Sequence, residues 1–475
     1  MKRPWRVGST PLLVGAVVAA LVATLLLRDS PGFVVRTDDG GYEGDITSYV
    51  YWTRLVALGG IQAAYSGSWP ETYAVYPPVT LYGFQVVGTL YRVAVDPSFD
   101  LQRALASSWL PRGFKGAAVT WHLASALALF LLLRRMTTAR RASWSGALYV
   151  ANPAALYDAA HWAQPDGAHG LFSMLAVGWL SLGLPLLGWA AMALAALAKP
   201  QAWAILPLLA LASWRVGRLR GLAAGAAVAV ATSLAVVLPF LLAGRLADLL
   251  SLPGTIASVM PVATADAHNV WWLTLAARGL DPLTTLDSAR LVGPVTYRTA
   301  AAALVLAQFA LIYWLFWSQR ATLAEAAALG ALGWFVFTTE AHENHLFLAL
   351  PLLALAWPSR PGLLAAYAVL SGTLLLNMVL HDQLVLEALG VGLADPFVQW
   401  LRGANALANV VCFAAWSVAA ALRERPADER TAKRQRPSRQ PSANEPSAIS
   451  RQPSAGRGAT RGHETGVRSP RRADS

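Results

Sequence analysis

Cysteine and charge are both scarce in this chain of 475 residues. The single cysteine, Cys412, excludes an internal disulfide bond and gives no information about the redox state of the compartment. Asp, Glu, Lys and Arg make up 13% of the sequence, against roughly 25% in soluble domains. Hydrophobic residues make up 56%. Few charges between long apolar runs predict an all-α polytopic membrane protein.

The sequence also lacks the motifs of several enzyme classes. It contains no Walker A motif, no dinucleotide-binding fingerprint and no internal repeat, so a bound nucleotide or nucleotide sugar is not indicated. Glu340, His342, Glu343 and His345 raise the question of a metal site. However, the run His-Glu-Asn-His places its histidines three residues apart, which is not the metalloprotease spacing. We expect no required cofactor, and a divalent cation is unsupported.

The net charge of +12 is concentrated at the C-terminus. Residues 423–475 contain 13 Lys and Arg residues against 6 Asp and Glu residues, among Pro, Ser, Gln and Gly. A segment of this composition cannot bury a core. We predict a disordered basic cytoplasmic tail, with binding to anionic lipid or to a partner protein as the alternative. Because the basic residues are not spread over a fold, nucleic acid is not an expected partner.

Apolar segments separated by short basic loops predict about twelve membrane spans. The basic loops at 134–141, 215–220, 320 and 360 should be cytoplasmic, and so should both termini. The protein is then expected in the cytoplasmic (inner) membrane. The predicted spans lie near 11–27, 117–133, 142–160, 167–182, 184–198, 201–214, 221–243, 294–317, 321–339, 345–358, 361–380 and 403–422.

The apolar stretch at 77–95 is not counted as a span. If it crossed the membrane, every later basic loop would change sides. We therefore predict that this stretch is one of two helices lying in the membrane interface. The chain then divides into a cytoplasmic N-terminus with the first span (1–27), an outer loop with two interfacial helices (28–116), a transmembrane module (117–243), a second outer loop (244–293), the C-terminal spans (294–422) and the tail (423–475).

Asp45 is the first candidate catalytic residue. It stands at the start of the first of these amphipathic helices. A carboxylate at the outer membrane surface can accept the proton of a hydroxyl whose oxygen attacks a sugar. An aspartate here can also serve as the N-cap of the helix, and the two roles are compatible. Asp38, Asp39 and Glu43 lie nearby, and loop solvation is the simpler interpretation of all three.

A series of short motifs occurs in a fixed order over residues 1–380. The motifs are Gly44-Asp45 with Trp52 after six further residues, Tyr76-Pro77-Pro78-Val79-Thr80-Leu81-Tyr82, Lys115, Asn152-Pro153, Trp162-Ala163-Gln164-Pro165-Asp166, Lys199-Pro200-Gln201, Asn269-Val270-Trp271 and His342-Glu343-Asn344. In these motifs and their order the chain resembles the GT-C glycosyltransferases. The similarity is greatest to the branch that contains the dolichyl-phosphate-glucose glucosyltransferases and bacterial polyprenyl-phosphate-sugar mannosyltransferases. The chain differs from bacterial relatives, which often have glycine in place of Ala163.

This resemblance implies a fold and a chemistry. It implies a conserved membrane module, two interfacial helices in the first outer loop, and inverting transfer of a sugar from a lipid phosphate without a nucleotide. By the same resemblance, Asp45 is the catalytic base and His342 lies near the donor phosphate.

Polar residues at the outer ends of the predicted spans are further candidates. Trp162, Gln164 and Asp166 could bind hydroxyls of the acceptor sugar, or they could form a polar cluster that caps a helix. Lys115 and Lys199 could stabilise a departing lipid phosphate, or they could extend to lipid head groups.

Three more residues complete the candidate substrate-binding set: Tyr76, Glu343 and Asn269. Asn269 stands where the second outer loop re-enters the membrane, beside two tryptophans. These tryptophans fit interfacial anchoring, and a groove for the isoprenoid chain beside them is the second interpretation.

The predicted function is transfer of one sugar, with a mannose-like hexose favoured, from a polyprenyl-phosphate sugar to a glycan, glycolipid or protein acceptor at the outer membrane face. The main alternative is a lipid or solute transporter, such as a flippase of envelope assembly. A transporter would place charged residues in mid-span and often contains inverted repeats. A third possibility is a non-catalytic subunit that scaffolds envelope-assembly enzymes through its tail. The polar residues gather at one membrane face, which favours interfacial chemistry.

Overall fold

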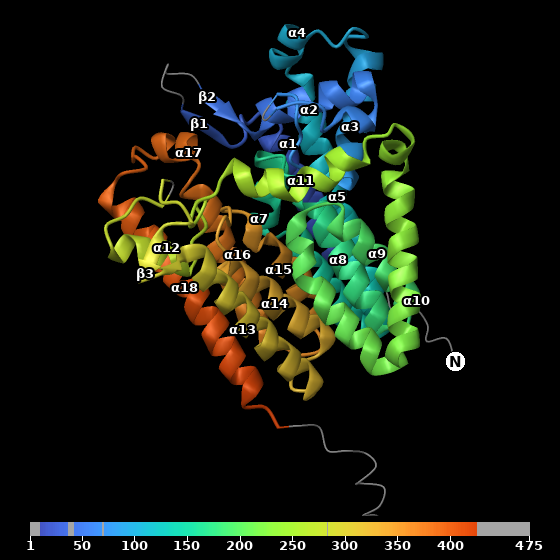
Figure 1. Cartoon of the computed structure of the whole chain (residues 1–475), viewed down its shortest axis with the longest axis vertical. Helices are drawn as coiled ribbons and strands as arrows, with labels where there is room; N and C mark the ends of the chain where they lie inside the picture. Colours follow the sequence, from blue (N-terminus) through green and yellow to red (C-terminus); the bar gives the residue numbers. More distant parts are fainter. Residues whose placement is uncertain (1–9, 37–41, 69–70, 283, 425–475) are drawn as a thin grey trace, which may run out of the picture. The chain divides into compact units, whose positions relative to one another are not determined.

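The chain folds almost wholly into helices (Figure 1). The computed structural model describes residues 10–36, 42–68, 71–282 and 284–424. Within these residues the strands form two antiparallel pairs, β1 (Val34–Arg36) with β2 (Tyr42–Gly44) and β3 (Arg290–Val292) with β4 (Val295–Thr296). The predicted class, an all-α polytopic membrane protein, is confirmed. Asp38, Asp39, the basic N-terminal residues and nearly all of the tail lie outside the described residues.

The helices follow the chain in two groups. The first group is α1 (Thr10–Leu27), α2 (Asp45–Gly59), η2 (Ile61–Ala63), α3 (Pro78–Ala94), α4 (Leu101–Leu105), α5 (Trp109–Met136), α6 (Ala139–Val150), α7 (Pro153–Leu156), η3 (Tyr157–His161), α8 (Asp166–Ser181), α9 (Pro185–Ala196), η4 (Pro200–Ile205) and α10 (Leu206–Leu242). The second group is α11 (Leu246–Val259), α12 (Val270–Ala277), α13 (Tyr297–Trp317), α14 (Leu323–Phe337), η5 (His345–Leu348), α15 (Ala349–Ala356), α16 (Leu363–Val379), α17 (Gln383–Ala388) and α18 (Pro396–Ala421).

Four helical segments of the described chain are long and apolar enough to cross a membrane. They are α5, the run Pro200–Leu242, α13 and α18, and six shorter apolar helices accompany them. Helix α10, which makes up most of the run Pro200–Leu242, contains a break. At this break Arg218 has non-helical backbone angles, with φ of 52°. Ser213 and Gly225 both approach the indole of Trp189, although they would lie about 18 Å apart along a straight helix. The chain therefore folds back near Arg218, as the two separate predicted spans require.

The span expected over 142–160 is not one continuous helix. Helix α6 ends at Val150, and η3 is a short π-helical turn. Between them, the side chain of Asn152 accepts hydrogen bonds from the backbone N–H groups of Ala154 and Ala155 at 3.0 and 3.2 Å. Asn152 is thus the N-cap of α7, and the following proline suits the first helical position. This cap starts a new helix and interrupts the expected span.

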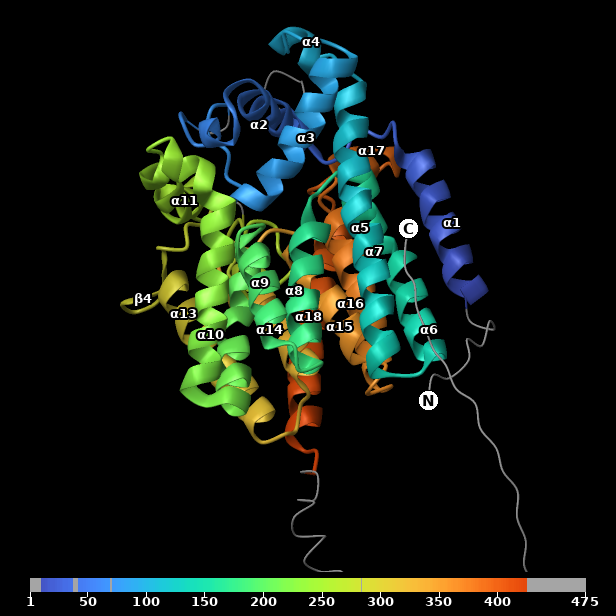
Figure 2. The same ribbon diagram turned by 90° about the vertical axis from the view of Figure 1, so that its right-hand side faces the viewer.

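The basic turns meet at one end of the helices, opposite α2 and α3 (Figure 2). Arg141 donates to the backbone oxygen of Pro358 at 2.9 Å, which joins the turn after α5 to the turn after α15. The buried carboxylate of Glu325 forms ion pairs with Arg360 at 3.0 Å and with Arg423. One end of the bundle therefore collects the arginines that the sequence assigns to the cytoplasm, and the assignment of that end to the cytoplasm remains a prediction.

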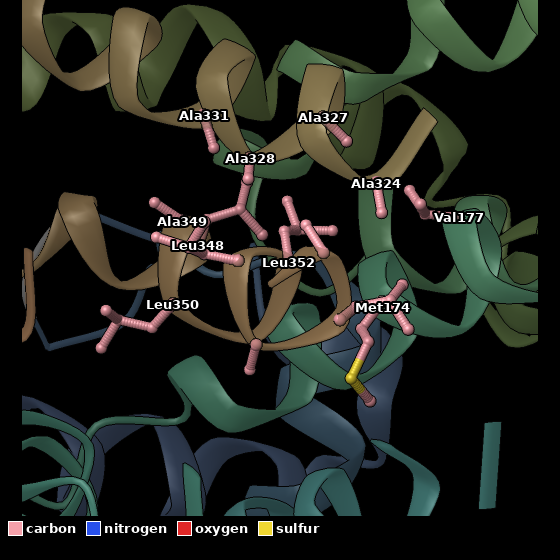
Figure 3. Packing of buried hydrophobic residues seen from close by; sticks show 14 of the residues in the cluster. Met174, Val177, Ala324, Ala327, Ala328, Ala331, Leu348, Ala349, Leu350 and Leu352 are labelled. Atoms are coloured by element: carbon pink, nitrogen blue, oxygen red, sulfur yellow. The ribbon is translucent and has the colours of Figure 1, made fainter. Parts of the chain in front are cut away.

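The main apolar core lies between α8, α14 and α15. Figure 3 shows Val177 of α8 beside Ala324 of α14, and Leu352 of α15 below the alanines of α14. Small side chains let helices approach closely, which suits packing within a membrane. Because α14 and α15 are held together here, the segment that connects them, residues 338–344, has fixed ends.

A second apolar cluster holds the two helices of the first outer loop. The rings of Tyr49, Phe84 and Phe114 come from α2, α3 and α5, and their centroids lie 4.9–5.7 Å apart. Aromatic pairs at such separations add stability beyond the area they bury. Both expected helices are present, and they pack on the N-terminal end of α5. Their position in the membrane interface remains a prediction.

Candidate active site

A cavity of about 850 Å³ is lined by segments that lie far apart in the sequence. The residues that line it include Asp45 of α2, Tyr76 before α3, Gln164 before α8 and Lys199 before η4. The wall also includes the segment 338–345, the loop around Asp266, and α18. A cavity of this size, mostly apolar with a few converging polar groups, has the character of a small-molecule or lipid head-group site.

Asp45 is the first residue of α2 and not its cap. Gly44 occupies the N-cap position, and no side chain caps the helix there, so the expected capping role of Asp45 is wrong. The backbone of Gly44 approaches that of Phe33 so closely that a Cβ atom would lie 2.0 Å from the Phe33 carbonyl oxygen. The close contact with the strand β1 region fixes the start of α2 and leaves the Asp45 side chain facing the cavity.

A chain of hydrogen bonds orients the Asp45 carboxylate. Gln164 Nε2 donates to Asp45 Oδ2 at 2.5 Å, and the Tyr76 hydroxyl donates to Gln164 Oε1 at 3.0 Å. The Tyr49 hydroxyl lies 3.2 Å from that of Tyr76. Because Tyr76 donates to the amide oxygen, the amide nitrogen must face Asp45. Gln164 follows Ala163, whose φ of 63° lies in the left-handed region, which explains why glycine would suit position 163.

The surroundings of Asp45 adjust its protonation. Burial raises the pKa of Asp45 to about 6, the positive charge of Lys199 and the hydrogen bond from Gln164 oppose the rise, and the negative charge of Asp166 adds to it. A carboxyl group with this pKa is mostly ionised above pH 6 and still has substantial affinity for a proton. Both properties suit a general base near neutral pH.

Lys199 and Asp166 form a buried ion pair next to Asp45. Lys199 Nζ donates to Asp166 Oδ1, and it lies 5.5 Å from the centroid of the Tyr76 ring. Burial alone would lower the pKa of Lys199, but the Asp166 carboxylate more than offsets burial and the pKa is raised. Lys199 is therefore charged and balanced by a partner, and its ammonium group has further N–H donors. Asp166 lies behind Lys199 and does not itself line the cavity.

His342 and Glu343 are both uncharged near neutral pH. The His342 side chain keeps 41% of its surface exposed to the cavity, but the protein around it and the charge of Lys199 lower its pKa to about 4. Burial and the nearby Asp266 raise the pKa of Glu343 to about 8. An imidazolium at His342 is therefore disfavoured at neutral pH, because a cation there would be desolvated and would face a second cation.

Besides Asp166, three candidates from the sequence do not line the cavity. Lys115 donates to the backbone oxygens of Leu27 and Ser30 at 2.9 and 2.5 Å, and so it fixes the end of α1. Trp162 donates to Asp382 at 3.0 Å. Asn269 caps α12 and donates to the backbone of the neighbouring α14 end at 3.3 Å. These three side chains hold distant segments together, and we do not retain them as substrate-binding candidates.

Sequence reasoning missed a group of residues on the far side of the same cavity. They are Asp266, His381 and Arg402, which line it beside Trp272, one of the two tryptophans noted next to Asn269. Arg402 gave a usable signal, because a charged side chain within an apolar helix of membrane-spanning length usually marks a functional site. Asp266 and His381 gave none, since each stands in a short polar stretch beside an apolar segment.

No metal site is apparent in the part of the chain that is described, where no three His, Cys, Asp or Glu side chains are placed to hold a metal ion. The expectation that no cofactor is required remains a prediction.

Comparisons with known proteins give little further guidance. No protein-family model matches the chain, and no curated protein matches it. Among solved structures, it is similar to ArnT from Cupriavidus metallidurans in the apo state, with 15% sequence identity and a TM-score of 0.47 over 87% of this chain and 77% of that chain. This likeness carries no argument about function, which must therefore come from the cavity.

Proposed function

We propose that the protein is an inverting GT-C-type glycosyltransferase that uses a polyprenyl-phosphate sugar. The observation that carries the proposal is that an oriented carboxylate, Asp45, shares one cavity with Lys199 and with His342. Transfer from a lipid phosphate needs a base for the acceptor hydroxyl and donors for the phosphate, and these groups supply both.

The donor phosphate binds between Lys199 and His342. Lys199 retains N–H donors beyond its bond to Asp166, and His342 exposes its ring to the cavity. An arriving phosphate adds negative charge beside His342 and favours its protonation, which would reverse the lowering of its pKa. The protonated His342 then stabilises the negative charge that grows on the phosphate during the reaction.

The reaction follows from these positions. The ionised Asp45 accepts the proton of the acceptor hydroxyl while that oxygen forms a bond to the anomeric carbon of the donor sugar. The bond between this carbon and the phosphate oxygen breaks, and its electron pair stays on the phosphate. Polyprenyl phosphate leaves from the opposite face of the sugar, so the anomeric configuration inverts. Gln164 keeps Asp45 in position throughout.

Apolar residues in the cavity wall suit a lipid donor. Ile256, Val259 and Met260 come from the end of α11, Trp334 comes from α14, and Leu393 follows α17. They extend the polar end of the cavity with a surface that can cover the first isoprene units of the donor. We propose this path in place of the groove expected beside Asn269.

Purified protein with a panel of polyprenyl-phosphate sugars and a membrane acceptor fraction tests the proposal. We expect release of polyprenyl phosphate with one or a few donors, and a mannose-like hexose is the first donor to try. The conservative variant Asp45→Asn should release almost none. The matched control Asp100→Asn changes an exposed N-cap of α4 to another good capping residue and should retain full activity.

A different pair of results would contradict the proposal. Absence of polyprenyl phosphate release with every donor, together with movement of a lipid-linked sugar across the bilayer of reconstituted vesicles, would favour the transporter alternative.

A further inference from the structure

Two histidines connect a carboxylate of the cavity to the interior of the protein. Nδ1 of His381 lies 3.1 Å from Asp266 Oδ1, and Nε2 of His381 lies 3.0 Å from Nε2 of His268. Nδ1 of His268 is 2.8 Å from Nδ2 of Asn405. Both histidines and Asn405 are buried, whereas Asp266 keeps 19% of its side-chain surface exposed and lines the cavity.

The partners of Asn405 determine where the protons lie in this chain. Asn405 Nδ2 donates to the backbone oxygen of Thr373 at 2.8 Å, so the amide nitrogen is the atom that faces Thr373 and His268. His268 must then accept at Nδ1 and carry its proton on Nε2. His381 in turn accepts at Nε2 and carries its proton on Nδ1, next to Asp266. The order is self-consistent with two neutral histidines and one ionised aspartate.

The protonation of Asp266 agrees with this order. Burial opposes ionisation, but the electrostatic attraction and hydrogen bond of the His381 N–H, together with the positive charge of Arg402, overcome it, so the pKa of Asp266 is lowered. Asp45 and Asp266 therefore differ: one carboxylate has a raised pKa that suits a base, and the other is held in its ionised form.

The backbone around Asp266 is held by asparagines from two helices. Asn377 of α16 donates to the backbone oxygen of Asp266 and accepts from the backbone of His268, both at 2.8 Å. Asn409 of α18 donates to the backbone oxygen of His268 at 2.9 Å. These contacts keep Asp266 in the left-handed region, with φ of 64°, which costs free energy for any residue with a side chain. Strain held by this many contacts is common where a side chain must be aimed at a ligand.

Arg402 lies at the same side of the cavity. Its guanidinium donates to the backbone oxygen of Leu380 and lies 5.5 Å from the centroid of Trp272. This side of the cavity thus presents an ionised acceptor, the Asp266 carboxylate, and a cationic donor, the Arg402 guanidinium. An acceptor and a donor side by side can bind neighbouring hydroxyl groups of a sugar.

The loop of Asp266 is also joined to the segment that contains His342. The backbone N–H of Ala265 donates to the backbone oxygen of Ala341 at 2.9 Å, and Asp266 pairs with His342 in an isolated β-bridge. A sugar attached to a phosphate at His342 would therefore have Asp266 as a near neighbour.

We propose that Asp266, oriented by His381 and assisted by Arg402, is a subsite that binds hydroxyl groups of the donor hexose. This inference rests on the proposed use of a lipid-phosphate sugar. Asp266 accepts hydrogen bonds from the sugar, and His381 is a positioning residue that does not touch it. The subsite gives the cavity a means to select the sugar, separate from the groups that act on the phosphate and the acceptor.

Equilibrium binding without an acceptor tests the subsite on the intact protein. The probes are a polyprenyl-phosphate hexose and polyprenyl phosphate without a sugar. Asp266→Asn should weaken binding of the first by about 10- to 100-fold and leave binding of the second unchanged. His381→Gln should act in the same direction with a smaller effect. Asp395→Asn, which exchanges one N-cap of α18 for another, is the matched control and should bind both probes normally.

Deoxy donors make the test independent of folding. The wild type should lose affinity when the recognised hydroxyl is removed from the donor, and Asp266→Asn should show no further loss with that donor. Equal weakening of both probes in Asp266→Asn, or the same loss with the deoxy donor in both proteins, would overturn the subsite. Absence of sugar transfer together with the expected binding pattern would contradict the proposed reaction and still support the subsite.

Discussion

Replacement of Asp45 by asparagine separates the chemistry of the carboxylate from its structural role. Asparagine has nearly the same shape and can still accept the hydrogen bond from Gln164 through its amide oxygen, so α2 should keep its position. It cannot accept a proton. Loss of a general base costs about 10²- to 10⁴-fold in rate, so we expect kcat to fall by that amount while donor binding changes little.

The pH dependence gives the sharper measure. With a pKa of about 6 for Asp45, the wild-type rate should rise about tenfold per pH unit up to that value and then level off. The residual rate of Asp45→Asn should lack this inflection. Initial rates of polyprenyl phosphate release at saturating donor, measured between pH 5 and 8, provide both profiles.

Stability should change in the opposite direction to activity. Burial raises the pKa of Asp45 above its ordinary value of 3.8, so the folded state binds the proton more tightly than the unfolded state. The carboxylate therefore destabilises the fold as pH rises from about 4 to 6, by no more than about 3 kcal/mol above that range. Asp45→Asn removes this cost and should raise Tm at pH 7.5 but not at pH 4. Wild-type kcat in Asp45→Asn, or a wild-type profile without an inflection near pH 6, would refute the reasoning.

Substitutions at three further positions test the residues that hold the site and its surroundings in place. Lys199→Met should lower kcat/KM for the donor by about tenfold to a thousandfold, and Lys199→Arg, which keeps the charge beside Asp166, should retain more of it in the same steady-state assay. Gly44→Ala would place a Cβ atom 2.0 Å from the Phe33 carbonyl oxygen, so turnover should fall while the circular dichroism spectrum stays helical; normal turnover would mean that α2 can shift without harm. Asp382→Ala removes the acceptor shared by three side chains, so thermal unfolding in detergent should show a loss of roughly 3 kcal/mol or more, and an unchanged Tm would show that this cluster is not structural.

Hydropathy and helix periodicity identified most of the helices, because both depend on residues close together in the sequence. The alternation of basic and polar loops also placed Asp45, Lys199 and His342 at one face, and all three line one cavity. The predictions failed where local contacts of a single residue decide where a helix starts. Asn152 interrupts an apolar run with a cap, and Gly44 takes the capping position from its neighbour.

The use of each polar side chain could not be read from its position. Lys115 and Trp162 have suitable chemistry for substrate contacts, yet their hydrogen bonds go to Ser30 and Asp382, which are 85 and 220 residues away. Contacts of this kind depend on the packed structure. The same is true of Asp266, whose role depends on histidines and asparagines from other segments.

Charge states were the least predictable feature. The positions of the residues in the chain did not identify Asp166 as the partner of Lys199, and they did not show that His342 would be neutral. Both outcomes follow from burial, which penalises a lone charge and favours a pair.

A structure of the Asp45→Asn variant with a bound polyprenyl-phosphate sugar tests the central claim most directly. The account predicts the phosphate in contact with Lys199 and His342, and the anomeric carbon turned toward residue 45. A phosphate bound outside this cavity, or a sugar whose anomeric carbon faces away from residue 45, would contradict it.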